Sequence, residues 1–143
     1  MAVVHKTVLI NYSAEQMFHL VDRVEEYPEF LPWCGGVEVA ERGEHGLTAK
    51  LKINYHGLKQ SFSTQNTNER PTSMTMRLVE GPFKHFEGRW RFKALREDAC
   101  KIEFDMEYEF SSRLLEGVIG PVFNMIANSF VDSFCKRAEQ IYG

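Results

Sequence analysis

The C-terminal segment, residues 114–142, limits the possible folds of this chain more than any other stretch. Its apolar residues recur at spacings of three and four, which is the period of one face of an α-helix. Pro121 suits a first helical turn, so the helix begins there or extends back to Leu115. The longer version would span about 40 Å and would need a broad apolar partner. The expected inner face comprises Leu115, Val118, Ile119, Val122, Phe123, Ile126, Phe130, Phe134, Ala138 and Ile141.

The middle of the chain, residues 37–110, supplies that partner as a predicted β-sheet. Apolar and polar residues alternate there, which indicates strands with one dry face and one solvated face. Residues 47–55 alternate clearly, whereas residues 58–67 are mostly polar and predict an edge strand or a wall facing water. The last two strands predict their own register, because aromatic and oppositely charged residues should pair across them. The expected pairs are Arg89–Asp105, Trp90–Phe104 and Arg91–Glu103.

The N-terminal part adds one strand and two helices to this plan. Residues 4–11 are rich in β-branched residues and predict a strand. Ser13 and Gln16 have the spacing of a capping box, so a helix should begin after Ser13, and residues 27–33 predict a short second helix. The chain of 143 residues suits a single domain, residues 1–143. We therefore expect an α+β fold in the order strand, two helices, six antiparallel strands and a long helix.

The sequence contains no recognisable catalytic pattern. Its five histidines have no metal-ligand spacing, and it has neither a nucleophile elbow nor a nucleotide-binding loop. Cys34 has no basic neighbour in the sequence to activate it, so a structural role is favoured. We expect a protein that is not an enzyme and needs no metal or cofactor.

Charge and cysteine content indicate the compartment and exclude one class of partner. A net charge of −3 argues against DNA as a partner. Three cysteines without a pairing pattern are typical of free thiols in a reducing compartment. The N-terminus has no secretory signal, and the expected location is the cytoplasm.

Three short motifs occur in the order and spacing of a known family. They are Tyr27-Pro28-Glu29-Phe30-Leu31-Pro32-Trp33-Cys34, Gly81-Pro82-Phe83-Lys84 and Gly88-Arg89-Trp90-Arg91-Phe92. With the predicted order of elements, they resemble the START-like coenzyme Q-binding family over essentially the whole chain. The resemblance implies a helix-grip fold, in which a curved antiparallel sheet of about seven strands wraps around the C-terminal helix and an apolar cavity.

This family resemblance implies two activities, and the residues do not choose between them. The first is binding of ubiquinone or a related polyisoprenoid or lipid, as a carrier or chaperone that supports respiration and contacts the membrane transiently. The second is that of a bacterial ribosome association toxin, which blocks association of the ribosomal subunits. A polyketide cyclase or aromatase is disfavoured, because no acid/base group lies among the apolar residues. For the toxin, the residues expected to form a single local patch that faces ribosomal RNA are Lys50, Lys52, Lys59, Arg89, Arg91 and Lys93.

The large apolar residues allow two interpretations. Periodicity alone predicts an ordinary packed core, whereas the resemblance implies the wall of a cavity in which the hydroxyl of Tyr55 or Tyr108 would anchor a polar headgroup. The expected ligand-binding residues are Trp33, Tyr55, Phe62, Met74, Met76, Phe86, Trp90, Phe92, Phe104, Met106, Tyr108 and Phe123. Tyr27, Phe30 and Leu31 form either a structural plug or a gate for a lipid, and an exposed apolar patch would favour the gate.

Overall fold

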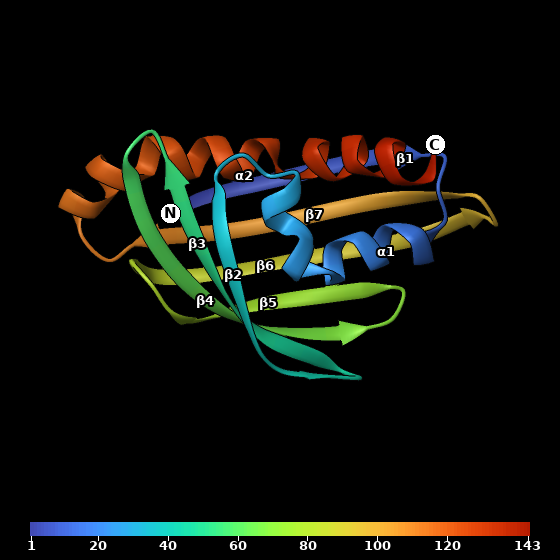
Figure 1. Ribbon diagram of the computed structural model, residues 1–143, viewed down its shortest axis with the longest axis horizontal. Coiled ribbons are helices and arrows are strands. Elements are labelled where there is room, and N and C mark those ends of the chain that lie inside the picture. The colour runs from blue at the N-terminus through green and yellow to red at the C-terminus, as the bar shows by residue number, and fades with distance from the viewer.

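A computed structural model describes residues 1–143 as one seven-stranded sheet with two α-helices and a 3₁₀ helix (Figure 1). The predicted order of elements and the α+β helix-grip fold are confirmed. The elements are β1 Ala2–Ile10, α1 Ala14–Asp22, η1 Val24–Glu29, β2 Cys34–Gly43, β3 Gly46–Tyr55, β4 Leu58–Glu69, β5 Ser73–Glu80, β6 Phe83–Arg96, β7 Ala99–Phe110 and α2 Arg113–Tyr142.

All neighbouring strands are antiparallel, in the order β1-β7-β6-β5-β4-β3-β2. Each expected pair of β6 and β7 is present, including Trp90 opposite Phe104. The expectation of an edge strand at residues 58–67 is wrong, since β4 lies between β3 and β5. Its inner face is polar and buried, and side-chain hydrogen bonds stabilise it: Thr64 donates to Asn66 Oδ1 at 2.9 Å, and Asn68 donates to Asp22 Oδ1 at 3.0 Å.

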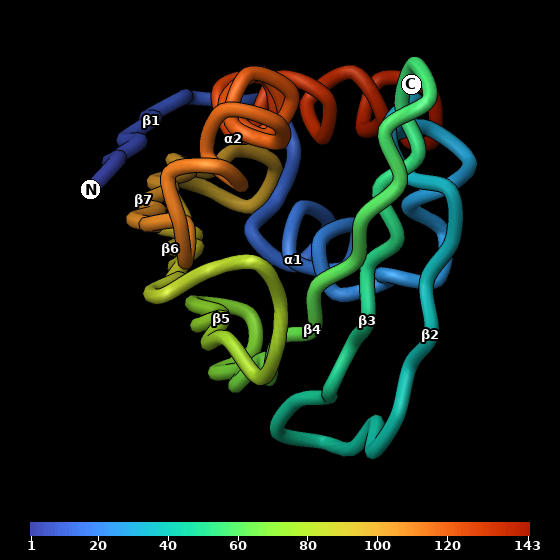
Figure 2. Tube along the Cα trace, turned by 90° about the vertical axis from the view of Figure 1, so that its left-hand side faces the viewer, coloured from blue at the N-terminus to red at the C-terminus, as the bar shows by residue number.

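The sheet bends so that β2, β3 and β4 form an arm set at an angle to β6 and β7 (Figure 2). The long helix α2 runs across the sheet, and α1 lies on the same inner side (Figure 1). α1 begins with the predicted capping box, in which the Gln16 amide donates to Ser13 Oγ at 3.0 Å. The side chains of Met17, Phe18 and Val21 are fully buried, so α1 closes the core beside α2.

The helix α2 has the longer of its two predicted extents, because it begins before Pro121. Its inner face buries Ile119, Phe123, Ile126, Phe130, Phe134 and Ala138 as expected. Val118 and Ile141, which were expected inside, are 56% and 50% exposed. Val118 lies about 100° around the helix from Ile119, and Ile141 is in the last turn, where the helix has little to pack against.

The short helix predicted over residues 27–33 both starts and ends earlier, since it spans Val24–Glu29. It is the 3₁₀ helix η1, which contains Pro28 near its end rather than in its first turn. Tyr27 fixes it to α1, because its buried hydroxyl donates to the Val21 carbonyl at 2.5 Å. The physical reason for the shift is that Val24 is 2% exposed and extends the buried face of α1 past Asp22.

Candidate functional site

The structure has an apolar cavity between sheet and helix, as the family resemblance implied, but the cavity is small. Its volume is about 30 Å³, whereas pockets for drug-sized ligands hold about 300–1,000 Å³. This volume is about that of one water molecule. Its lining residues are Trp33, Leu51, Phe62, Thr64, Met76, Phe86, Met106, Phe123, Ile126, Ala127 and Phe130.

The structure brings half of the predicted ligand-binding residues to this cavity. The members that line it are Trp33, Phe62, Met76, Phe86, Met106 and Phe123. Met74, Trp90, Phe92 and Phe104 are buried in the core but do not line it. Sequence reasoning left out Leu51, Thr64, Ile126, Ala127 and Phe130, of which Ile126 and Phe130 could have been found from the helical period.

Neither tyrosine expected to anchor a headgroup reaches the cavity. Tyr55 is half-buried at the end of β3, where its ring lies 4.2 Å from that of His56. The Tyr108 hydroxyl donates to the Asn124 side chain on α2, and burial raises the pKa of this phenol. The anchoring role expected for these hydroxyls has no geometric support, because neither tyrosine lines the cavity and the Tyr108 hydroxyl already has an acceptor.

The segment expected to act as plug or gate is packed as a plug. Tyr27, Leu31 and Trp33 are almost fully buried, and Phe30 is half-buried. The Phe30 ring lies edge-on to Phe134 at 5.2 Å and beneath the Arg137 guanidinium at 5.0 Å. These residues form no exposed apolar patch, and such a patch is what would have favoured a gate.

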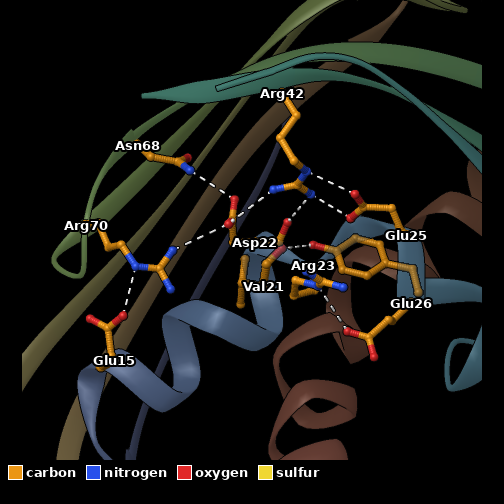
Figure 3. A network of polar contacts seen from close by, with 10 residues as sticks. Glu15, Val21, Asp22, Arg23, Glu25, Glu26, Arg42, Asn68 and Arg70 are labelled. Atoms are coloured by element: carbon orange, nitrogen blue, oxygen red, sulfur yellow. Dashed lines mark hydrogen bonds and ion pairs between the residues drawn. The ribbon is translucent and has the colours of Figure 1, made fainter. Parts of the chain in front are cut away.

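A polar network around Asp22 was not expected from the sequence (Figure 3). Asp22 is 8% exposed, and its carboxylate lies 3.4 Å from Arg42 Nη1 and 3.5 Å from Arg70 Nη1. It also accepts from Asn68 Nδ2 at 3.0 Å, while the Asn68 Oδ1 atom is buried without a partner. The network ties the end of α1 to β2 and β4, elements far apart in the sequence.

The outer members of this network are more exposed. Arg42 donates to both oxygens of Glu25 at 2.9 and 2.5 Å, and Arg70 Nε donates to Glu15 at 2.8 Å. The pKa of Glu25 is lowered from its ordinary value. Partial burial acts to raise this pKa, but hydrogen bonds from its own backbone and from Arg42, together with the arginine charges, outweigh that effect. The network joins secondary-structure elements to one another, because its arginines and carboxylates are paired within it.

A surface groove of about 440 Å³ lies along the outer face of β3 and β4. Its lining residues are Gly35, Lys50, Lys52, Ile53, Asn54, Lys59, Gln60 and Ser61. The structure thus brings three of the six expected RNA-facing residues together. Arg89, Arg91 and Lys93 are on β6, separated from β4 by β5, so the expected single patch is wrong.

The arginines of β6 also differ from the groove lysines in their surroundings. Arg91 Nη1 lies 3.5 Å from Glu103, and Arg89 is opposite Asp105 on β7. The acidic neighbours reduce the positive potential of this part of the sheet.

One cluster of possible metal ligands lies on the outer face of β6 and β7. His85, Glu87 and Glu107 place ligand atoms within 4.8 Å of one another, and His85 Nε2 is 3.0 Å from Glu107 Oε1. The sequence did not reveal this set because Glu107 comes from the neighbouring strand. Exposed acidic groups are common on sheets without an ion, and the cluster alone does not define a metal centre.

The three cysteines are in environments that suppress their reactivity. Burial raises the pKa of Cys34, and burial with neighbouring acidic groups raises the pKa of Cys135 to about 11. Burial and the nearby Cys135 raise the pKa of Cys100 to about 11. The structural interpretation of Cys34 is therefore supported, since a raised pKa keeps the thiol protonated.

We expect iodoacetamide to modify the folded protein slowly at pH 8. A pKa of about 11 leaves about 100-fold less thiolate than the ordinary value of 9.0. The greater nucleophilicity of a more basic thiolate recovers part of this, so the net slowing is about tenfold before steric protection. Mass spectrometry would follow the reaction, with urea-unfolded protein as the control. Equal rates in the folded and unfolded protein would contradict this picture of the thiols.

The bent antiparallel sheet that grips one long helix defines a START-like helix-grip protein. Residues 10–135 match the family described as polyketide cyclase/dehydrase and lipid transport, and the chain belongs to this family.

Individual relatives carry different activities in their names. The chain is 43% identical to ribosome association toxin RatA of Vibrio cholerae, over 100% of this chain and 99% of the relative. It is 26% identical to the mitochondrial coenzyme Q-binding protein COQ10 of Drosophila melanogaster, over 96% of this chain and 59% of that protein. The crystal structure of the Zhui aromatase/cyclase of Streptomyces sp. R1128 aligns with a TM-score of 0.81 at 18% identity, covering 99% and 96% of the two chains. This last likeness concerns the fold alone.

Proposed function

We propose that this chain is a cytoplasmic, bacterial protein of the RatA type, which binds a ribosomal subunit and hinders association of the two subunits without catalysing a reaction. The observation that carries the proposal is the full-length similarity to RatA at 43% identity. The nearly filled interior adds support, because an apolar cavity of about 30 Å³ does not hold a quinone ring. The protein would act through its surface and would need no cofactor.

An association assay with purified bacterial subunits tests this function. We expect added protein to lower the fraction of subunits that sediment as whole ribosomes in a sucrose gradient, in proportion to its concentration. A heat-unfolded sample of the same chain is the control for nonspecific effects. An unchanged ribosome peak at a large excess of folded protein would rule the function out.

A hydrophobic ligand is a second candidate, favoured by the position and walls of the small cavity. Met76 and Met106 line it, and flexible thioether side chains adapt to a guest more readily than branched ones. Ubiquinone or another lipid would enter only if α2 moved away from the sheet. Leu114 and Val118 are exposed on α2 and would be the apolar contact with a membrane.

Native mass spectrometry of protein purified from its own host tests for this ligand. A carrier would retain a lipid or quinone whose mass appears on the folded protein and disappears after unfolding. Ligand-free protein that also fails to take up added ubiquinone would remove the second candidate and leave the first intact.

A further inference from the structure

We propose that the groove on the outer face of β3 and β4 holds backbone phosphates of ribosomal RNA, through Lys50, Lys52 and Lys59. This inference rests on the proposed function, and it assigns the contact with the ribosome to one surface. The lining of the groove, its charge and its lack of exposed apolar groups each support a phosphate ligand.

Strand pairing brings the three lysines together. In β3, Leu51 and Ile53 point inward and are buried, so Lys50 and Lys52 point outward on the same face. Across the strand pair, Lys52 is opposite Ser61, and Lys59 is opposite Asn54. In each of these two pairs, a lysine on one strand faces a neutral polar residue on the other, along the wall of one groove.

One glycine of the neighbouring strand, Gly35, belongs to the wall of the groove. Gly36 of β2 pairs with Lys52, and Gly35 occupies the irregular position beside it. A Cβ atom on Gly35 would come within 2.8 Å of the Asn54 Cβ, so a side chain there would displace the groove wall. The absence of a side chain at Gly35 therefore lets the Asn54 side chain keep its place in the groove wall.

The lysines of the groove are weakly neutralised. Glu38 is the acidic neighbour of two of them, with its carboxylate 3.9 Å from Lys50 Nζ and 3.7 Å from Lys52 Nζ. These distances exceed those of charge-assisted hydrogen bonds, and Lys59 forms no ion pair. None of the lining residues is acidic, although the whole chain carries a net charge of −3. The groove is a local cationic site on an acidic protein.

An anionic membrane would match the charge but not the lining. Peripheral binding to lipid combines basic residues with apolar side chains that enter the interface. The one apolar lining residue, Ile53, is 2% exposed and points into the core. Asn54, Gln60 and Ser61 instead offer hydrogen-bond donors, which suit phosphate and sugar oxygens.

Two matched triple variants test this assignment. Lys50→Gln/Lys52→Gln/Lys59→Gln removes three charges from the groove, and Arg89→Gln/Arg91→Gln/Lys93→Gln removes three charges from the outer face of β6. Binding to purified ribosomal subunits would be measured by co-sedimentation over a series of KCl concentrations. Circular dichroism would verify that both variants fold, which is expected because Lys50 is partly exposed and the other five residues are exposed.

We expect the groove variant to bind roughly 100-fold more weakly at about 0.15 M salt, and its plot of log affinity against log salt to be shallower by about 2 to 3. The β6 variant should stay within about threefold of the wild type. Equal losses in the two variants, or wild-type affinity in the groove variant, would overturn the assignment while leaving the proposed function in place. Failure of the wild type to bind any subunit would overturn the proposed function and the groove with it.

Vesicles containing phosphatidylglycerol serve as a competing probe. We expect the wild type to prefer subunits to these vesicles. Binding to vesicles that depends on the three lysines, with subunit binding that does not, would identify a membrane surface as the partner and overturn the RNA assignment.

Discussion

Replacing Trp90 by alanine is expected to lower the free energy of unfolding by about 3 to 5 kcal/mol. The Trp90 side chain is fully buried, at the centre of the core between sheet and helix. Its ring centroid lies 4.6 Å from that of Phe104 and 5.3 Å from that of Phe134. Truncation would leave a large void, because neighbouring aromatic rings collapse only partly into such a space. Urea unfolding followed by circular dichroism would measure the loss.

Trp90→Phe is the matched control for this substitution. The Trp90 Nε1 atom is buried without a hydrogen-bond partner, so removing it breaks no bond. The phenylalanine variant should therefore lose only about 1 to 2 kcal/mol, from reduced volume. A loss below about 1 kcal/mol in Trp90→Ala would mean that this region is loosely packed. That result would favour the interpretation of the aromatic residues as a cavity wall.

The sequence was sufficient to predict the sheet where alternation was regular. The pairs Trp90–Phe104 and Arg91–Glu103 are correct because a shift of one residue would turn every buried side chain of the strand outward. The same reasoning failed for β4, because Thr64, Asn66 and Asn68 are polar yet point inward. Their burial depends on partners such as Asp22, which no local pattern reveals.

The candidate sites were only partly predictable, for two physical reasons. A cavity volume is the small difference between the space enclosed by the backbone and the volume of the side chains that fill it. Knowing that residues 62 and 76 are Phe62 and Met76 therefore does not predict whether a cavity remains between them. A charged patch depends on which strands are neighbours. Two strands, β4 and β5, separate Lys52 on β3 from Arg89 on β6, although the alternation of the sequence places both side chains on the solvated face.

Replacing Asp22 by alanine is expected to lower the free energy of unfolding by about 2 to 3 kcal/mol. The change removes the acceptor of Asn68 Nδ2 and leaves a buried amide with no partner for either of its polar atoms. It also removes the carboxylate shared by Arg42 and Arg70. Both arginines are partly exposed and can be hydrated by water, which keeps the loss below that of a fully buried ion pair. Urea unfolding would measure it.

Glu15→Ala is the control, because Glu15 is the other acidic partner of Arg70 but is exposed. Its loss should stay within about 1 kcal/mol, as is typical of surface ion pairs. The double variant Asp22→Ala/Asn68→Ala should lose less than the sum of its single variants, since no buried amide is then left unpaired. Strict additivity, or equal losses for Asp22→Ala and Glu15→Ala, would show that the buried hydrogen bond does not hold α1 to β4.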